Sequence, residues 1–148
     1  INRMCKAIRS TGCKKLTFYN VSQDFRVAPA IRKSDIQGST HAWYPSALNN
    51  NYSIEGNGLL FVDHYEQMLH PDLRGKAKIV YEFDATDMAS GFMFPAMARE
   101  FRRGGIQFAA IFSYDMLRTA PMNLGWQTHF FNMVFTPSKA VSSMIAAE

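Results

Sequence analysis

The chain has 148 residues, of which 47% are hydrophobic and 19% are charged, a composition typical of one packed globular domain. Its formal charge at pH 7 is only +4, and no basic cluster is longer than a pair such as Arg102–Arg103. Because a nucleic-acid footprint needs a concentrated basic patch, we expect no nucleic-acid partner. No apolar run reaches the roughly 18 residues of a membrane-spanning helix, so we also expect no membrane span.

The N-terminal stretch is predicted to form an amphipathic helix, because its apolar residues recur at i, i+3, i+4 and i+7. These residues are Ile1, Met4, Cys5 and Ile8. Gly12 is expected to end this helix as a left-handed cap. The helix pattern is already under way at Ile1, so we expect the chain to be a segment cut from a longer protein. Cys5 and Cys13 are expected to be two buried thiols rather than a disulfide, which leaves the compartment open.

Two strands are predicted in the first third of the chain. Lys15–Val21 is the first, and a short helix follows near Pro29–Lys33, with Pro29 in its first turn. Asp35–Tyr44 is the second strand, and its Gly38 suits a bend or the close approach of another backbone. The Asn- and Gly-rich stretch Ser46–Gly58 is long for a connection, a length typical of functional loops.

The remaining elements alternate between helix and strand. We expect a helix over Leu59–His70, a strand over Lys78–Phe83, a helix over Phe94–Arg103, a strand over Ile106–Ser113 and a final helix that begins at Thr136–Pro137. The buried face of that last helix is predicted to consist of Ala140, Val141, Met144 and Ile145.

Four successive strand–helix units predict an α/β fold with a parallel sheet and right-handed crossovers. Such a sheet can be a small open sheet, or it can be half of an eight-stranded barrel. Neither GxGxxG nor GxxxxGK[ST] follows any predicted strand, so we expect no nucleotide cofactor.

Polar and aromatic residues gather where the predicted strands end, which is where parallel α/β sheets place their chemistry. Glu82 is the central candidate, because strict alternation puts Val80, Glu82 and Asp84 on one face of their strand. By the same rule His41 and Trp43 share a face of the second strand, with Tyr44 on the other.

Flat aromatic rings combined with hydrogen-bond acceptors suit a sugar, which offers CH faces for stacking and hydroxyls for bonding. The candidate rings are Trp43, Tyr44, Tyr114 and Trp126, and the candidate acceptors are Asn20, Glu82 and Asp84. The alternative for each ring, and for His41, is an ordinary place in the core.

No metal site is predicted. His64 and His70 are six residues apart, which is not the spacing of HExxH, and Glu66 between them is read as part of a polar helix face. No GxSxG elbow and no Cys–His–Asn signature is present, so acyl transfer has no candidate nucleophile.

Four segments of the chain resemble the C-terminal half of a (β/α)8-barrel glycoside hydrolase. They are HAWYP, YEFDATD, FSYDM and the closing THFFNMVFTPSKAVSSMIAAE. The chain is similar to the clan A retaining enzymes, particularly those that act on polysaccharides. The similarity covers nearly the whole chain, from the helix before strand five to the helix after strand eight.

The resemblance implies a role for each matching residue. Glu82 matches the strand-seven nucleophile, and His41 matches the residue of strand six that orients it, with Trp43 or Tyr44 as alternatives. Tyr114 stands near the place where the family has a tryptophan. The general acid/base of the family lies on strand four, as Asn-Glu, before the point where this chain starts.

The resemblance therefore implies that residues 1–148 form half of a catalytic domain and need the N-terminal half of the same barrel, from the same or another chain, for hydrolysis. The parent enzyme would be secreted or periplasmic, with a carbohydrate as its substrate. Two alternatives stay open: a barrel enzyme that uses Glu82 as a general base, and a non-catalytic sugar-binding or interaction module.

Overall fold

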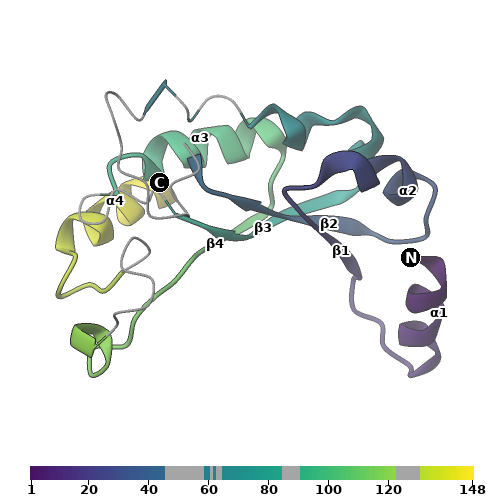
Figure 1. Cartoon of the computed structure of the whole chain (residues 1–148), viewed down its shortest axis with the longest axis horizontal. Coiled ribbons are helices and arrows are strands. Elements are labelled where there is room, and N and C mark those ends of the chain that lie inside the picture. The colour runs from purple at the N-terminus through teal and green to yellow at the C-terminus, as the bar shows by residue number, and fades with distance from the viewer. Residues whose placement is uncertain (46–58, 61, 63–64, 85–90, 123–130) are drawn as a thin grey trace.

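The computed structural model describes residues 1–45, 59–60, 62, 65–84, 91–122 and 131–148 (Figure 1). The fold is mixed α/β, with one sheet of four strands that are all parallel and lie side by side in chain order. The strands are β1 (Phe18–Ser22), β2 (Gly38–Trp43), β3 (Ala77–Phe83) and β4 (Phe108–Ile111). This arrangement confirms the predicted parallel sheet and is consistent with parallel strand–helix units, with β1, β2 and β4 shorter than predicted.

Among the described residues, four α-helices accompany the sheet: α1 (Asn2–Ser10), α2 (Ala28–Arg32), α3 (Phe94–Gly104) and α4 (Pro137–Ala147). Short 3-10 turns occur at η1 (Phe25–Val27), η4 (Glu66–Leu69), η5 (Pro71–Leu73) and η6 (Ala120–Met122). Within its described part, the helix predicted over Leu59–His70 consists only of short turns, because the backbone is extended at His70 and Pro71 starts a new turn. No described helix combines the length and the apolar character needed to cross a bilayer.

The core lies between the sheet and its helices. Figure 1 shows α2, α3 and α4 on the same side of the sheet, while α1 and the segment after β4 extend away from its two ends. One buried cluster joins β2 and β3 to α3 and η4, and a second joins β1 to α1, α2 and η5. The i, i+3, i+4, i+7 spacing of Phe94, Met97, Ala98 and Phe101 predicts the face that α3 buries. Phe94, Met97 and Phe101 are buried and Ala98 is half-buried, which confirms this face. The other side of the sheet has none of these three helices, and we call it the open face.

The predicted buried face of α4 is wrong. Val141, Met144 and Ile145 are 55%, 72% and 59% exposed, and Ala140 is half-buried. The helix instead turns its smaller residues toward the sheet, where Ser143 and Ala146 face β3 and β4. Its buried residue is Lys139, which is fully enclosed.

A β-bulge interrupts the alternation of β3. His41 of β2 pairs with Val80, but the next residue of β2, Ala42, pairs with Glu82. Tyr81 therefore has no partner on β2 and is the extra residue of the bulge. Val80 and Phe83 both lie in the helix-side core, three positions apart, which a regular strand cannot achieve. The prediction that Val80 and Glu82 share a face is therefore wrong.

The helix ends follow their sequence signals. Gly12 (φ +84°) and Gly105 (φ +70°) adopt the left-handed conformation after α1 and α3. Thr136 occupies the N-cap position of α4, although its hydroxyl bonds the backbone of Asn132 rather than the helix. Cys5 and Cys13 are both free thiols, and Cys5 is buried as predicted, whereas Cys13 is only half-buried.

Gly38 lies where neighbouring groups approach the sheet very closely. A Cβ atom on Gly38 would come within 2.3 Å of the Phe18 ring and 2.6 Å of the Ala77 carbonyl oxygen. The close approach expected from the sequence is therefore confirmed, and a backbone oxygen is one of the atoms involved.

We predict that Gly38→Ala lowers the free energy of unfolding by about 1–3 kcal/mol, the usual cost of overpacking, because the Ala77 carbonyl cannot move without breaking the ladder. Urea unfolding followed by circular dichroism measures this change. Gly104→Ala is the matched control and should be nearly neutral, since its new methyl would meet only the flexible Met68 side chain, at 3.3 Å. Equal stabilities of the two variants would contradict the prediction.

Candidate active site

The candidate site is built on a pair of side chains at the carboxyl ends of β2 and β3. Tyr44 follows Trp43 directly, and because Trp43 is buried in the helix-side core, alternation turns Tyr44 to the open face. There its hydroxyl donates a hydrogen bond to the carboxylate of Glu82. Glu82 is half-buried. Adjacent parallel strands therefore bring a phenol and a carboxylate together on the open face.

The surroundings hold Tyr44 in its neutral form. Burial, and then the negative charges of Glu82 and Asp84, raise the pKa of the Tyr44 hydroxyl well above its ordinary value of about 10. At neutral pH Tyr44 is thus a permanent hydrogen-bond donor. A donor fixed on one part of a carboxylate restricts its rotation and leaves the rest of it to act on a ligand.

Asp84 has a different role from the one predicted. It is fully buried, and both of its carboxylate oxygens accept hydrogen bonds of 3.2 Å from Lys139 Nζ of α4. Lys139 is also fully buried. An acid that is enclosed and paired in this way is not a free acceptor for a sugar hydroxyl. The pair ties the end of β3 to α4 directly beside Glu82.

His41 and Trp43 do share a face of β2, but that face is the core, which corrects the predicted substrate-binding role of both residues. His41 is 0% exposed and its ring is stacked on Phe25, with centroids 5.5 Å apart. Trp43 is 7% exposed and is stacked on Tyr65 at 4.8 Å. Of the three residues considered as the partner of Glu82, namely His41, Trp43 and Tyr44, only Tyr44 lies on the same side of the sheet as Glu82.

Two further predicted residues lie at the borders of the open face, and a third is not described. Asn20 is exposed on β1, where its Oδ1 accepts hydrogen bonds from Thr40 Oγ1 (3.1 Å) and from the backbone of Ser22 (3.0 Å). Tyr114 is 52% exposed and packs edge-to-face on Phe131, beyond the end of β4. Trp126 lies outside the described residues.

The sequence interpretation missed three residues of the site. Lys139 lay in a stretch read only for its apolar residues, and Tyr81 was assigned to the wrong face because the bulge was not foreseen. Ser22 was taken to follow β1, whereas it ends that strand and its hydroxyl is 3.3 Å from the Tyr81 hydroxyl. Long-range pairing set all three positions, and no local signal marked them.

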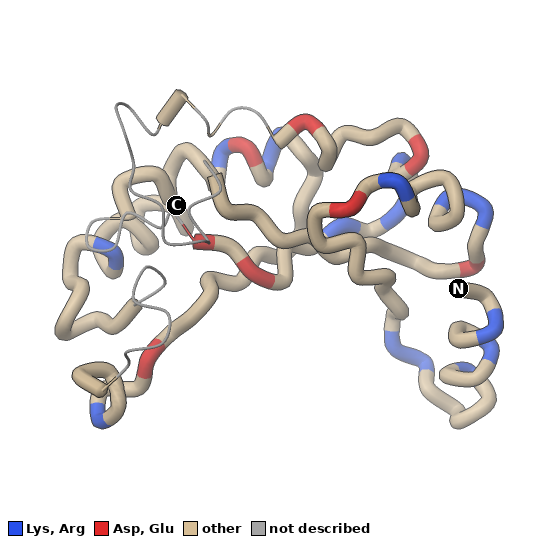
Figure 2. The backbone as a smooth tube through the Cα atoms, viewed as in Figure 1, with Lys and Arg blue, Asp and Glu red and all other residues tan. Residues whose placement is uncertain are grey.

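The charge distribution separates this site from the N-terminal end of the molecule. Figure 2 shows acidic positions at the carboxyl end of β3 and mainly basic positions along α1 and the segment that follows it. Among the described residues, no three His, Cys, Asp or Glu side chains lie close enough together to hold a metal ion. What the site offers a ligand is a carboxylate and several hydroxyls.

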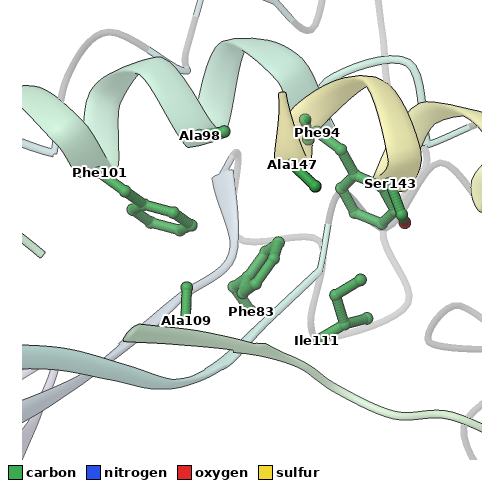
Figure 3. Close-up of a pocket in the computed structure, with 9 residues that line it drawn as sticks. Phe83, Phe94, Ala98, Phe101, Ala109, Ile111, Ser143 and Ala147 are labelled. Carbon is green, nitrogen blue, oxygen red and sulfur yellow. The ribbon is translucent and has the colours of Figure 1, made fainter. Parts of the chain in front are cut away.

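The larger hollows among the described residues lie elsewhere. One, of about 210 Å³, is bounded by α3, α4, β3 and β4, and Figure 3 shows the rings of Phe83, Phe94 and Phe101 around it. The other, of about 420 Å³, separates α1 from the outer side of β1. Glu82 lines neither hollow. The first is almost entirely apolar and belongs to the helix side, so neither is part of the site around Glu82.

Comparisons with protein-family models, with curated proteins and with solved structures give no match for this chain.

We predict that Lys139→Met lowers the free energy of unfolding by about 3–5 kcal/mol, because it leaves the Asp84 carboxylate buried without its counter-ion. Combining it with Asp84→Asn should recover at least half of that loss, since no uncompensated charge remains. Urea unfolding of the variants measures both changes.

Lys6→Met is the control, because Lys6 is exposed on α1 and its loss should change stability by less than about 0.5 kcal/mol. A Lys139→Met variant as stable as Lys6→Met would contradict the structural role of the ion pair.

His41 gives a pH-dependent prediction. Burial, and then the nearby positive charge of Lys78, lower the pKa of His41 to about 4, against about 6.5 in an unfolded chain. As the pH falls below 6.5 the unfolded state takes up the proton first. The stability contributed by neutral His41 is therefore complete above pH 6.5 and is lost between pH 6.5 and 4, by about 3 kcal/mol in total.

The free energy of unfolding measured from pH 7.5 down to 4.5 should show this slope in the native protein and a smaller slope in His41→Gln. His70→Gln removes a half-buried imidazole at the surface of η5 and should retain the native slope, since His41 is still present. The same slope in all three proteins would show that His41 is not the responsible group.

Proposed function

We propose that this chain forms the C-terminal half of a (β/α)8 barrel and carries the nucleophile, Glu82, of a retaining glycoside hydrolase that acts on a polysaccharide or oligosaccharide. The observation that carries the proposal is the pairing of Glu82 with Tyr44 at the carboxyl ends of adjacent parallel strands, on the open face. Reacting side chains of (β/α)8 enzymes extend from the carboxyl ends of their strands.

The topology supports a barrel half over a doubly wound sheet. The strands follow one another in the order β1-β2-β3-β4, and α2, α3 and α4 lie on the same side (Figure 1). A doubly wound sheet reverses its strand order and carries helices on both faces. Winding in a single direction with helices on one side is the arrangement that closes into a barrel when more units are added.

In the proposed reaction the ionised Glu82 carboxylate attacks the anomeric carbon. An ester bond forms between Glu82 and the sugar, the bond to the leaving oxygen breaks, and its electron pair departs with that oxygen, which a general acid protonates. Water then hydrolyses the ester, assisted by the same acid in its basic form. Tyr44 holds the carboxylate in place through its hydrogen bond.

The second carboxyl group of the reaction is proposed to come from the N-terminal half of the barrel. Retaining enzymes place their two carboxyl groups about 5–5.5 Å apart on opposite sides of the scissile bond. Asp84 is unsuited to this role, since it is buried, is paired with Lys139 and extends from the same strand as Glu82. The chain by itself is therefore expected not to hydrolyse natural glycosides.

The proposed partner half would pair with the two edge strands. Within the described part of the chain, β1 and β4 each have one neighbour in the sheet. Phe108 of β4 is 59% exposed, and beside β1 the side chains of Met4 and Leu16 are 70% and 62% exposed. Apolar residues at open sheet edges favour association, so these edges support pairing with further strands.

The test of Glu82 uses 2,4-dinitrophenyl 2-deoxy-2-fluoroglycosides of several sugar configurations, because dinitrophenolate leaves without a general acid. We predict that one of them forms a covalent ester with the chain, releasing one equivalent of dinitrophenolate. Intact mass spectrometry and peptide mapping should locate the sugar on Glu82. Tyr44→Phe should slow labelling by about 10-fold, the loss expected when a charge-assisted hydrogen bond is removed.

Glu82→Gln should prevent labelling, and Glu66→Gln, an exposed change elsewhere, should leave it unaltered. A sugar ester on another carboxylate would refute Glu82 as the nucleophile. Absence of any ester, with sugar binding retained, would favour a binding module or a general-base enzyme.

A further inference from the structure

Two hydroxyl groups lie on the open face beside Tyr44 and Glu82, and the proposed reaction assigns them no role. Ser22 ends β1, and its Oγ is 3.3 Å from the hydroxyl oxygen of Tyr81 on β3. Both residues are half-buried. The two hydroxyls use one of their hydrogens in the hydrogen bond between them. Within the described part of the chain, the other hydrogen and several lone pairs remain for a ligand.

The Tyr81 ring must cross β2 to reach Ser22, because β2 lies between β3 and β1. On β2, Ala42 alternates with His41 and Trp43, both of the helix-side core, and so faces the open side. Ala42 is only 1% exposed although its side chain is a single methyl group. The phenol ring of Tyr81, which extends from β3 to Ser22 of β1, passes the strand that carries Ala42. Tyr81 therefore forms a floor across the open face, next to Glu82.

The backbone at Ser22 is held in an unusual conformation. Its φ is +52°, and no other non-glycine residue described here has a positive φ. Asn20 supports this conformation, because its Oδ1 accepts a hydrogen bond of 3.0 Å from the Ser22 backbone N–H. Strain of this kind is maintained where the surrounding structure requires it, and it is concentrated at functional sites. Here it directs the Ser22 hydroxyl toward Tyr81.

The spacing of the strands fits one sugar ring. Neighbouring strands are about 4.8 Å apart, so the hydroxyl pair near β1 lies roughly 10 Å from the line of β3 that carries Glu82. A pyranose whose anomeric carbon faces Glu82 extends over the Tyr81 ring and places its far hydroxyls beside this pair. A hydroxyl pair that both donates and accepts is suited to a sugar hydroxyl.

We propose that the Ser22–Tyr81 hydroxyl pair recognises a ring hydroxyl of the sugar bound at Glu82, on the side of the ring away from the anomeric carbon, and so determines which monosaccharide the site accepts. Asn20 is the positioning residue of the pair. This inference rests on the function proposed for Glu82.

The experiment compares labelling by 2,4-dinitrophenyl 2-deoxy-2-fluoroglycosides of gluco and galacto configuration, which differ only at C4. The native protein should prefer one of them, and Ser22→Ala and Tyr81→Phe should each reduce the ratio of their kinact/KI values by about 3- to 10-fold, the usual effect of one hydrogen bond. Ser22→Gly should reduce it equally, because it also lacks the hydroxyl while its backbone accepts the positive φ.

Tyr19→Phe is the matched control for Tyr81→Phe. Tyr19→Phe also removes a phenol hydroxyl from a strand. The Tyr19 side chain packs against the helix-side core beside β1, so this variant should retain the native ratio of kinact/KI values. If Ser22→Ala and Tyr81→Phe keep the native ratio, the inference is wrong while Glu82 keeps its role. Different ratios in Ser22→Ala and Ser22→Gly would attribute the effect to the backbone and would also overturn it.

Binding without reaction separates this inference from the proposed function. In Glu82→Gln, where no ester can form at residue 82, fluorine NMR should detect binding of the same sugars. Adding Ser22→Ala to this variant should weaken its affinity for the preferred sugar by a similar factor of about 3 to 10. If binding shows a sugar preference that depends on Ser22 but Glu82 is never labelled, the recognition role of the Ser22–Tyr81 pair is retained. Only the role of Glu82 as nucleophile is then refuted. Absence of both labelling and binding would refute both.

Discussion

The bulge at Tyr81 is the constraint on which the site depends. A regular strand gives alternate residues to the two faces of a sheet, and β3 must supply both Val80 and Phe83 to the helix-side core. One additional residue between them resolves this mismatch. As a result the chain presents Tyr81 and Glu82 in succession to the open face, one as a floor and the other as the reactive group of the proposed function.

The residues around Glu82 are held by interactions of very different kinds. On one side, Tyr44 donates its hydrogen bond from the neighbouring strand, and its raised pKa keeps it a donor. On the other, the enclosed ion pair of Asp84 and Lys139 connects the end of β3 to α4. A buried pair of this kind adds little net stability but is costly to break, so it fixes geometry more than it strengthens the fold.

Packing on the helix side of the sheet makes His41 and Trp43 part of the core and not of a sugar-binding surface. Stacking of Trp43 on Tyr65 and of His41 on Phe25 fills the space between sheet and helices with rings. Each of these residues looks chemically capable in isolation, yet packing uses the aromatic face that a sugar would need. Many aromatic side chains of this chain therefore lie in the core, and only some lie on the open face.

The sequence by itself determined the four parallel strands, the face of α3, the glycine caps and the place of Glu82 at a strand end, because hydrophobic periodicity and cap residues are local signals. Tertiary structure alone decided which strand residues face the helices, because the bulge at Tyr81 moves every later residue of β3 to the opposite face of the sheet. It also decided that Lys139 is buried and that Ser22 meets Tyr81, because those partners are 55 and 59 residues away along the chain.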